Sequence, residues 1–215
     1  METPAKRVAF FVDGFNVYHS LAKSVRFRKY LWLDLNCLCG RFLRKGQEMV
    51  GVYYFSALAH WNNEKVKRHR MFLSALESVG VNIVLGKYGK VTRSARLYDP
   101  RRKGKISVIY ETFEEKQSDV NIALYMHKMA VDDLYDEAAV ISGDGDFVPA
   151  IRLVQEGPYN KRVRIILPVN QRGTDLSAVA NEKAKIREKH LADSQFPESI
   201  TLPNGMKLRK PDQWR

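Results

Sequence analysis

Short apolar runs alternate along this chain with stretches in which apolar residues recur every three or four positions. The runs are rich in Val, Ile, Phe and Tyr, which is typical of buried β-strands. They predict strands within the ranges 7–12, 48–58, 81–86, 135–142 and 162–169. The helical spacing predicts helices within the ranges 15–24, 33–46, 61–79 and 145–157. Strands that alternate with helices favour parallel βαβ units. The pattern therefore predicts an α/β fold in three layers, with a mostly parallel sheet between helices.

Some helix ends carry a residue-level signal. Asp34 is a candidate N-cap for the 33–46 helix, and Gly46 is a candidate stop. Ser118 is a candidate N-cap for a further helix, which would place Asp119 in its first turn. Ile122, Met126 and Met129 would continue one face of that helix, at helical spacing.

Two regions break the alternation. Residues 87–105 carry eight basic residues against one acid, with Gly and Pro between them, and predict a flexible cationic flap or hairpin. Residues 106–116 alternate and are rich in Ile and Tyr, so they predict an extra strand. The tail at 193–215 contains prolines but is apolar at intervals. It predicts an ordered extension packed on a domain that spans 1–192.

Composition limits the classes of protein that fit this pattern. Hydrophobic residues make up 45% of the 215 residues, enough for a substantial core, which excludes disorder throughout. No apolar run approaches the roughly 20 residues that span a membrane, and the first residues lack the apolar stretch of a secretory signal. We therefore expect a cytoplasmic protein without a membrane partner. Cys37 and Cys39 have no second pair for a zinc site, so we expect reduced cysteines.

Charge indicates the kind of partner. The formal net charge is +12, from 36 basic against 24 acidic residues. An excess of this size favours a polyanionic partner, nucleic acid first.

Acidic residues stand where the predicted strands end. Asp13 follows the apolar run of the first strand, and Asp144 and Asp146 follow the strand that ends near Ser142. Because ligands bind at the carboxyl ends of strands in a parallel sheet, we expect these carboxylates to face one crevice. Asp119, in the first turn of its helix, would project toward the same edge.

Each of these residues also has a structural explanation. Asp13 could cap a helix, and residues 143–146, Gly-Asp-Gly-Asp, could simply form a tight turn. Asp119 could compensate a helix dipole. Their joint occurrence favours a site. Converging carboxylates repel each other unless a cation is present, and oxygen-only ligands suit Mg²⁺ or Mn²⁺. Such an ion could activate water to cleave a phosphodiester.

Other site chemistries fit less well. A haloacid-dehalogenase phosphatase needs a second Asp two residues after the first, where this chain has Phe15. No Walker loop is present. The turn at 143–146 lacks the spaced ligands of a calcium-binding hand. The five histidines show no two-His metal spacing, although His19 lies near Asp13 and could assist the site.

Three motifs resemble those of the NYN domain family, the LabA-like branch of the PIN-like metal-dependent ribonucleases. They are FFVDGFNVYHSL at 10–21, EEKQSDVNIAL at 114–124 and AAVISGDGDFVPAIRLV at 138–154, and the resemblance covers roughly residues 6–170. It implies a PIN-like three-layer α/β/α sandwich. It also implies that a metal cluster is formed by Asp13, Asp119, Asp144 and Asp146.

Further site residues follow from the same resemblance. Asn16 matches an asparagine that would orient a ligand or water, and Ser142 matches the serine before the acidic turn. Two positions depart from many relatives: Gly145 stands where a serine is common, and Tyr125 where a further Asp is common. The tail resembles an extension of some bacterial members, so we expect a bacterial source.

The sequence thus predicts a metal-dependent endoribonuclease. The basic segment would bind RNA phosphates and stack bases, and the resemblance favours single-stranded RNA. The residues predicted to contact RNA are Lys87, Lys90, Arg93, Arg96, Arg101, Arg102, Lys103 and Lys105, with Tyr88 and Tyr98. A solvated loop is the alternative for this segment.

Two other functions stay open. The first is a non-catalytic or weakly catalytic RNA-binding or regulatory module with a degenerate metal site, supported by Gly145 and Tyr125. The second is a phosphohydrolase of small nucleotides, which the basic segment disfavours because a mononucleotide offers few phosphates. A second basic cluster at 65–70 is interpreted as the solvent face of a helix. Homo-oligomerisation also stays open.

Overall fold

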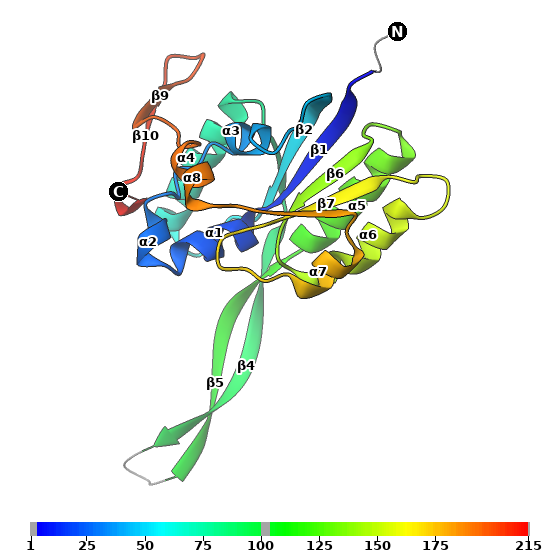
Figure 1. Ribbon diagram of the computed structural model, residues 1–215. Coiled ribbons are helices and arrows are strands. Elements are labelled where there is room, and N and C mark those ends of the chain that lie inside the picture. Colours follow the sequence, from blue (N-terminus) through cyan, green and yellow to red (C-terminus); the bar gives the residue numbers. More distant parts are fainter. Residues whose placement is uncertain (1–3, 100–103, 215) are drawn as a thin grey trace.

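Six parallel strands form the central sheet, in the order β3-β2-β1-β6-β7-β8 (Figure 1). The computed structural model describes residues 4–99 and 104–214. The sheet confirms the predicted parallel α/β fold. Its strands are β1 (Lys6–Asp13), β2 (Gln47–Ser56), β3 (Asn82–Leu85), β6 (Glu137–Ile141), β7 (Arg162–Leu167) and β8 (Glu182–Lys185).

Alternating side chains of the sheet enter two separate cores. Val8, Phe10 and Val12 of β1 belong to one buried cluster, whereas Ala9 and Phe11 belong to the other. The first cluster is covered by α1 (Gly14–Ala22), α2 (Val25–Arg28), α3 (Leu35–Gly40), α4 (Asn63–Ser78) and α8 (Glu188–Ala192). The second is covered by α5 (Ser118–Val131), α6 (Val148–Gln155) and α7 (Thr174–Val179). Both faces of the sheet are thus buried, as a parallel sheet requires.

Two predicted helix boundaries need correction. Asp34 caps α3 as predicted, since its side chain accepts a hydrogen bond from Cys37 N–H, but the helix ends at Gly40 rather than Gly46. The carbonyl of Phe42 instead accepts a hydrogen bond from the distant Arg164 guanidinium. Ser118 is not an N-cap. It is the first helical residue of α5, and its N–H donates to the Glu115 carboxylate at 2.9 Å.

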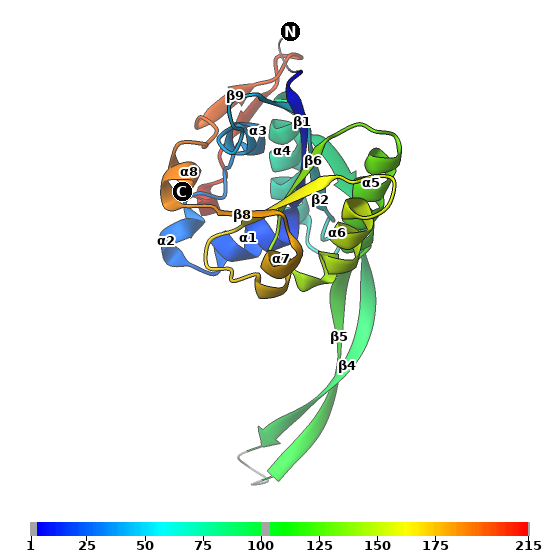
Figure 2. The ribbon, with the colours of Figure 1, turned by 45° about the vertical axis from the view of Figure 1, so that its right-hand side comes forward.

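The basic segment forms one strand of a long hairpin. β4 (Lys87–Asp99) pairs with β5 (Gly104–Lys116) in an antiparallel sheet of its own. The hairpin projects away from the body of the protein (Figures 1 and 2). The sequence predicted a flap or hairpin within 87–105, but residues 87–99 form a single strand, and the predicted extra strand at 106–116 belongs to the second arm of the hairpin rather than to the central sheet. Arg101, Arg102 and Lys103 lie outside the described residues.

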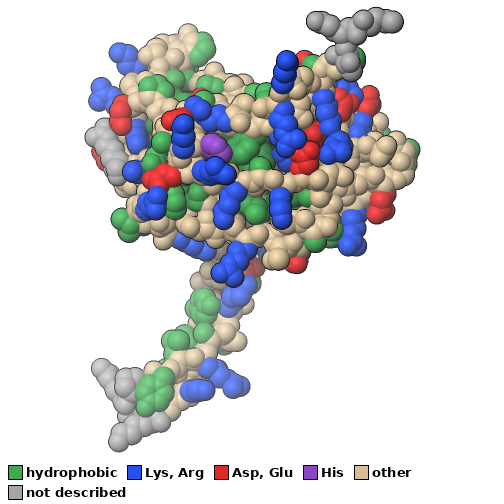
Figure 3. Space-filling view, in the orientation of Figure 1, with side chains coloured by type: hydrophobic (Ala, Val, Ile, Leu, Met, Phe, Trp, Pro, Cys, Tyr) green, Lys and Arg blue, Asp and Glu red, His purple; other side chains and the backbone are tan. Residues whose placement is uncertain are grey.

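Strand pairing offsets much of the hairpin's positive charge. Lys90 lies 2.7 Å from Glu111, and Arg93 forms an ion pair with Glu114. The acids come from β5, beyond the segment whose charge was counted in the sequence. Figure 3 shows hydrophobic side chains exposed along the hairpin; the exposed ones are Leu97, Tyr98, Ile109, Tyr110 and Phe113.

The C-terminal residues pack on the first core. Phe196 and Leu208 are buried in that cluster, and Trp214 packs against it. Asp34 N–H donates to the Ser194 carbonyl at 2.8 Å, and Phe196 N–H donates to the Trp32 carbonyl at 3.1 Å. The short strands β9 (Ser199–Thr201) and β10 (Lys207–Arg209) and a 3-10 turn, η2 (Asp212–Trp214), complete the tail. The domain boundary between 192 and 193 stays a prediction.

None of the helices among the described residues combines the length and apolarity needed to cross a bilayer.

Candidate metal centre

The carboxyl edge of the sheet carries the predicted site. β1 and β6 are neighbours at the point where the strand order reverses, which is where ligands bind in open α/β sheets. Asp13 ends β1 and caps α1, and Ser142 follows β6. Gly14 is needed at this corner because a Cβ there would lie 2.5 Å from the Phe55 carbonyl oxygen of β2.

Asp13 is buried, and both of its oxygens are engaged. One oxygen accepts from Asn16 N–H at 2.9 Å, and the other accepts from the Ser142 hydroxyl at 2.8 Å. The first bond is the N-cap that the sequence left as an alternative. The second ties β1 to β6. Burial raises the pKa of Asp13 to about 6, and the charges of Asp119 and Asp144 add to the rise.

The acidic turn after β6 is held by its own hydrogen bonds. Asn16 accepts from Gly143 N–H at 3.0 Å, so its side chain amide oxygen joins α1 to this turn. The Asp144 N–H donates to the Ser142 hydroxyl at 3.1 Å, and the Asp146 N–H donates to the Asp144 carboxylate at 3.0 Å. The latter bond opens a 3-10 turn, η1 (Gly145–Phe147). These bonds hold the turn in one conformation and aim its acids at the cleft.

Three carboxylates from two segments converge there. Asp119, Asp144 and Asp146 each offer an oxygen, and these oxygens lie within 4.8 Å of one another. Asp119 and Asp144 are half-buried, and Asp146 is exposed. The pKa of Asp119 is raised to about 6. Burial is the largest cause, and the negative charges of Asp144, Glu115 and Asp146 add to the rise. Asp13 is outside this group of three, but it lines the same cleft as Asp119 and Asp144.

The donor set fits a hard divalent cation. All three groups are carboxylates, and no nitrogen or sulfur ligand joins them among the described residues. Burial and mutual repulsion disfavour the ionised Asp119, and a cation would relieve both effects. Asp144 and Asp146 come from one rigid turn, which satisfies the demand for fixed ligand geometry.

The cleft around these acids includes residues that sequence reasoning missed. Glu115, whose carboxylate accepts from Ser118 N–H at the start of α5, stands beside Asp119 and could have been suspected from its place in the EEKQSD motif. The cleft has a volume of about 480 Å³. The other residues missed in its lining are Phe15, Lys23, Phe113 and Gln171.

The root of the hairpin brings aromatic residues to the same cleft. Tyr88 packs edge-on against Trp61 at 4.5 Å and against Phe15 at 5.9 Å between ring centroids. Trp61 in turn stacks on Phe113 at 4.0 Å. Tyr98, in contrast, is exposed near the far end of the hairpin. The described members of the predicted RNA-contacting set are therefore spread along the hairpin rather than gathered at the acids.

The two departures from the family pattern have different surroundings. A Cβ at Gly145 would lie 3.3 Å from a carboxylate oxygen of Asp175, so a serine there would crowd that acid. Tyr125 packs its ring on Tyr53 and Phe55 of β2, at 6.0 and 5.4 Å between ring centroids. Tyr125 thus contributes to packing of α5 on the sheet.

We expect Asp119→Asn to stabilise the metal-free protein more at pH 7.5 than at pH 4.5. The raised pKa means that the folded state holds the proton more tightly than the unfolded state. Stability is therefore lost as pH rises from about 3.8 to about 6, and Asn avoids this loss. Discounted for partial exposure, the gain is about 1 kcal/mol, or roughly 2–4 °C in the thermal midpoint.

Thermal unfolding in EDTA at both pH values measures this gain. Glu64→Gln is the control, because Glu64 is an exposed acid in the first turn of another helix, α4. A thermal midpoint of Asp119→Asn below that of the wild type at both pH values would contradict the expected repulsion.

Comparisons with known proteins show which family the chain matches. The family model described as NYN domain matches residues 7–186. The chain is 26% identical over 150 residues to low amplitude and bright protein LabA of Synechococcus elongatus, covering 69% of this chain and 68% of that protein. It is 24% identical to 6-hydroxy-3-succinoylpyridine 3-monooxygenase HspA of Pseudomonas putida, covering 100% of this chain and 77% of that protein.

A solved structure shares the fold. It is a protein of unknown function from Vibrio parahaemolyticus, 22% identical, with a TM-score of 0.56. The match covers 91% of this chain and 99% of that one.

Proposed function

Because this chain belongs to the NYN domain family, a branch of the PIN-like nuclease superfamily, we propose that it is a metal-dependent endoribonuclease. In this proposal Asp119, Asp144 and Asp146 hold one Mg²⁺ or Mn²⁺. The substrate is single-stranded RNA. The observation that carries the proposal is the convergence of these three carboxylates, within 4.8 Å, at the switch point of the sheet.

The proposed roles follow from the contacts of each residue. A bound Mg²⁺ or Mn²⁺ would supply charge for the scissile phosphate and activate water for attack. Asp119 and the turn at 144–146 would hold that ion. Asp13 would act as a positioning residue, since its oxygens hold Asn16 and Ser142 and thereby the turn. Glu115, beside Asp119, could accept a proton from the attacking water.

Labelled single-stranded RNA, incubated with the protein in Mn²⁺ or in EDTA, tests the proposal. We expect internal cleavage in Mn²⁺ and none in EDTA. RNA that is bound but intact under both conditions would instead support the regulatory module, in which the carboxylates no longer serve catalysis.

The Pseudomonas relative motivates a second candidate, an enzyme that acts on a small aromatic acid. An aromatic-lined cavity of about 220 Å³ beside the metal centre, with Lys65 and Arg68 among its lining residues, favours it. This candidate predicts that an aromatic carboxylate binds tightly and that RNA does not compete. Competition between labelled RNA and such an acid separates the two functions.

We expect the hairpin to supply sequence-independent affinity for RNA. Arg96 and Lys105 are exposed on neighbouring positions of one hairpin face. Replacing both by Ala should weaken RNA binding at every sequence and lower the slope of log affinity against log salt by about 1–2, because each phosphate contact contributes to that slope. Fluorescence anisotropy at several salt concentrations measures the slope.

The control for this pair is Lys45→Ala. Lys45 is exposed beside the start of β2, at the opposite edge of the sheet from the metal centre. An unchanged salt slope in the hairpin variant, or an equal loss per residue in Lys45→Ala, would remove the hairpin from the RNA-binding surface.

A further inference from the structure

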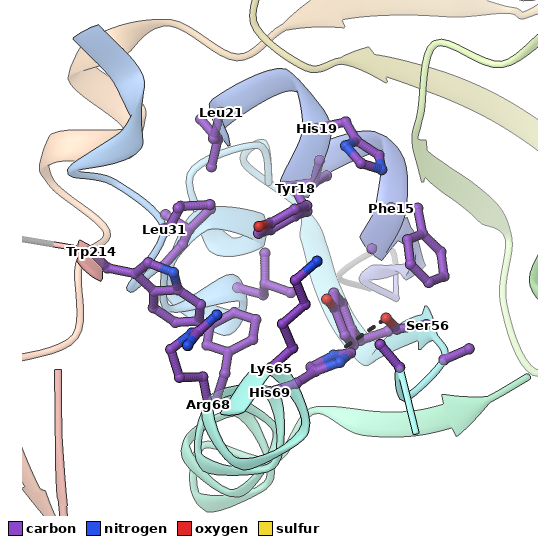
Figure 4. Close-up of a pocket in the computed structure, with 18 of the residues that line it drawn as sticks. Phe15, Tyr18, His19, Leu21, Leu31, Ser56, Lys65, Arg68, His69 and Trp214 are labelled. Carbon is purple, nitrogen blue, oxygen red and sulfur yellow. Dashed lines mark hydrogen bonds between the residues drawn. The ribbon is translucent and has the colours of Figure 1, made fainter. Parts of the chain in front are cut away.

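A second cavity lies against the candidate metal centre. It is enclosed by α1, by α4, by the root of the hairpin and by Trp214 of the tail (Figure 4). Its volume is about 220 Å³. The side chains of Phe15, His19 and Tyr88 line both this cavity and the acidic cleft. A ligand in the cavity is therefore separated from the acidic cleft by no more than these shared side chains.

The walls of this cavity are mostly apolar and aromatic. Leu21, Leu31, Tyr54 and Phe72 line it together with the rings of Trp61 and Trp214. Cavities of about 150 Å³ with apolar walls accept benzene. The space beside the metal centre therefore suits one flat ring system.

Two cations of α4 face this cavity. Figure 4 shows Lys65 reaching toward Tyr18, and Arg68 lying beside Trp214. Within residues 4–99 and 104–214, neither side chain has a carboxylate within 4.0 Å. They are three residues apart and so share one helix face, whereas Lys67 and Arg70 are exposed elsewhere on the helix. The cluster at 65–70 is largely exposed, as interpreted from the sequence, and Lys65 and Arg68 also line this cavity.

Neutral polar groups complete the lining. The Ser56 hydroxyl and His69 Nε2 are 3.3 Å apart, and both face the cavity (Figure 4). Burial lowers the pKa of His69 to about 4, so its imidazole is neutral at pH 7. With the hydroxyl of Tyr54, these groups offer both donors and acceptors to the edge of a ring.

We propose that this cavity binds the base of one nucleotide of the RNA, while Lys65 and Arg68 bind the phosphate attached to it. The inference rests on the proposed function, because the nucleotide belongs to the same substrate. Aromatic walls stack bases of any sequence, and free cations neutralise phosphate. The shared walls would bring the next phosphate of the strand to the three carboxylates.

Tryptophan fluorescence tests the proposal without catalysis. Trp61 and Trp214 line the cavity, and the chain has three tryptophans in all. In EDTA, a short single-stranded oligoribonucleotide should change the fluorescence saturably. Lys65→Ala with Arg68→Ala should weaken this binding about 10-fold and lower its salt slope by about 1–2. Tyr18→Ala, at an exposed ring of the rim, should weaken it about 5-fold or more.

The matched control carries the same charge change on the same helix. Lys67→Ala with Arg70→Ala should keep wild-type binding of the oligoribonucleotide in the fluorescence titration. An equal loss in both pairs, or RNA binding that leaves the fluorescence unchanged, would overturn the proposal.

Small molecules distinguish two possible occupants of the cavity, a nucleotide of RNA and a free aromatic acid. Adenosine monophosphate should compete with the oligoribonucleotide more strongly than inorganic phosphate does. Nicotinate that binds in the cavity without displacing RNA would overturn the proposal in favour of a free aromatic acid. Fluorescence changes without any cleavage in Mn²⁺ would support the cavity and overturn the ribonuclease. RNA cleavage with a wild-type KM by the double variant Lys65→Ala with Arg68→Ala would support the ribonuclease and overturn the role of the cavity.

Discussion

Asp144→Asn is expected to lower the Mn²⁺-dependent cleavage of RNA by at least about 100-fold while the protein stays folded. The substitution removes one of the three converging charges, and a ligand of a catalytic ion is worth several kcal/mol. The amide oxygen of Asn can still accept from Asp146 N–H, so the turn keeps its hydrogen bond. Because repulsion with Asp119 is relieved, the thermal midpoint in EDTA should equal or exceed that of the wild type.

Cleavage rate, thermal midpoint and the Mn²⁺-induced rise in that midpoint should be measured together. In the wild type the ion should raise the midpoint, since a ligand that binds only the folded state stabilises it. Asp144→Asn should lose most of this rise. Glu77→Gln, an exposed acid on α4, is the control and should behave as the wild type. Wild-type cleavage by Asp144→Asn would exclude Asp144 as a ligand.

Arg164→Met is expected to cost about 3–5 kcal/mol of the free energy of unfolding. Arg164 and Glu137 form an ion pair in which each side chain is only 2% exposed. The guanidinium also donates to the Phe42 carbonyl and to the Gln47 amide oxygen. Removing it leaves the buried carboxylate of Glu137, at the amino edge of the sheet, with the partly exposed Lys6 at 3.1 Å as its remaining ion-pair partner among the described residues.

Denaturant unfolding measures this loss. The matched control is Arg162→Met on the same strand, since Arg162 is 48% exposed and pairs with Glu182 at the surface. It should cost about 1 kcal/mol or less. A second change, Glu137→Met combined with Arg164→Met, should recover much of the stability because no unpaired buried charge remains. A cost of Arg164→Met no larger than that of Arg162→Met would show that the pair contributes little.

The arrangement of the acids could be predicted from sequence because it depends on local rules. An apolar run that ends on Asp13, and another followed by Asp144 and Asp146, place carboxylates at one edge of any parallel sheet. The position of Asp119 could be predicted from the start of the helix that follows the hairpin, because Asp119 lies in its first turn. The hydrogen bond from the Ser142 hydroxyl to Asp13 could not be predicted, because it joins residues 129 positions apart.

Other features depend on contacts between distant residues. Phe42, just after the end of α3, accepts a hydrogen bond from Arg164, which is 122 positions away. The charge of the hairpin was overestimated because the register of β4 with β5 brings Glu111 and Glu114 to its basic residues. The cavity that Lys65 and Arg68 line could not be predicted, because α1 and the tail form its other walls and no local pattern reveals them.

The most direct measurement of the central claim is the position of Mn²⁺ in a crystal of the protein soaked with MnCl₂, located by anomalous scattering. The account predicts one peak about 2 Å from oxygens of Asp119 and Asp144, with Asp146 reaching the ion directly or through water. Asp13 should keep its hydrogen bonds to Asn16 and Ser142. A fully soaked crystal with no peak between these carboxylates, or with the ion bound elsewhere, would contradict the account.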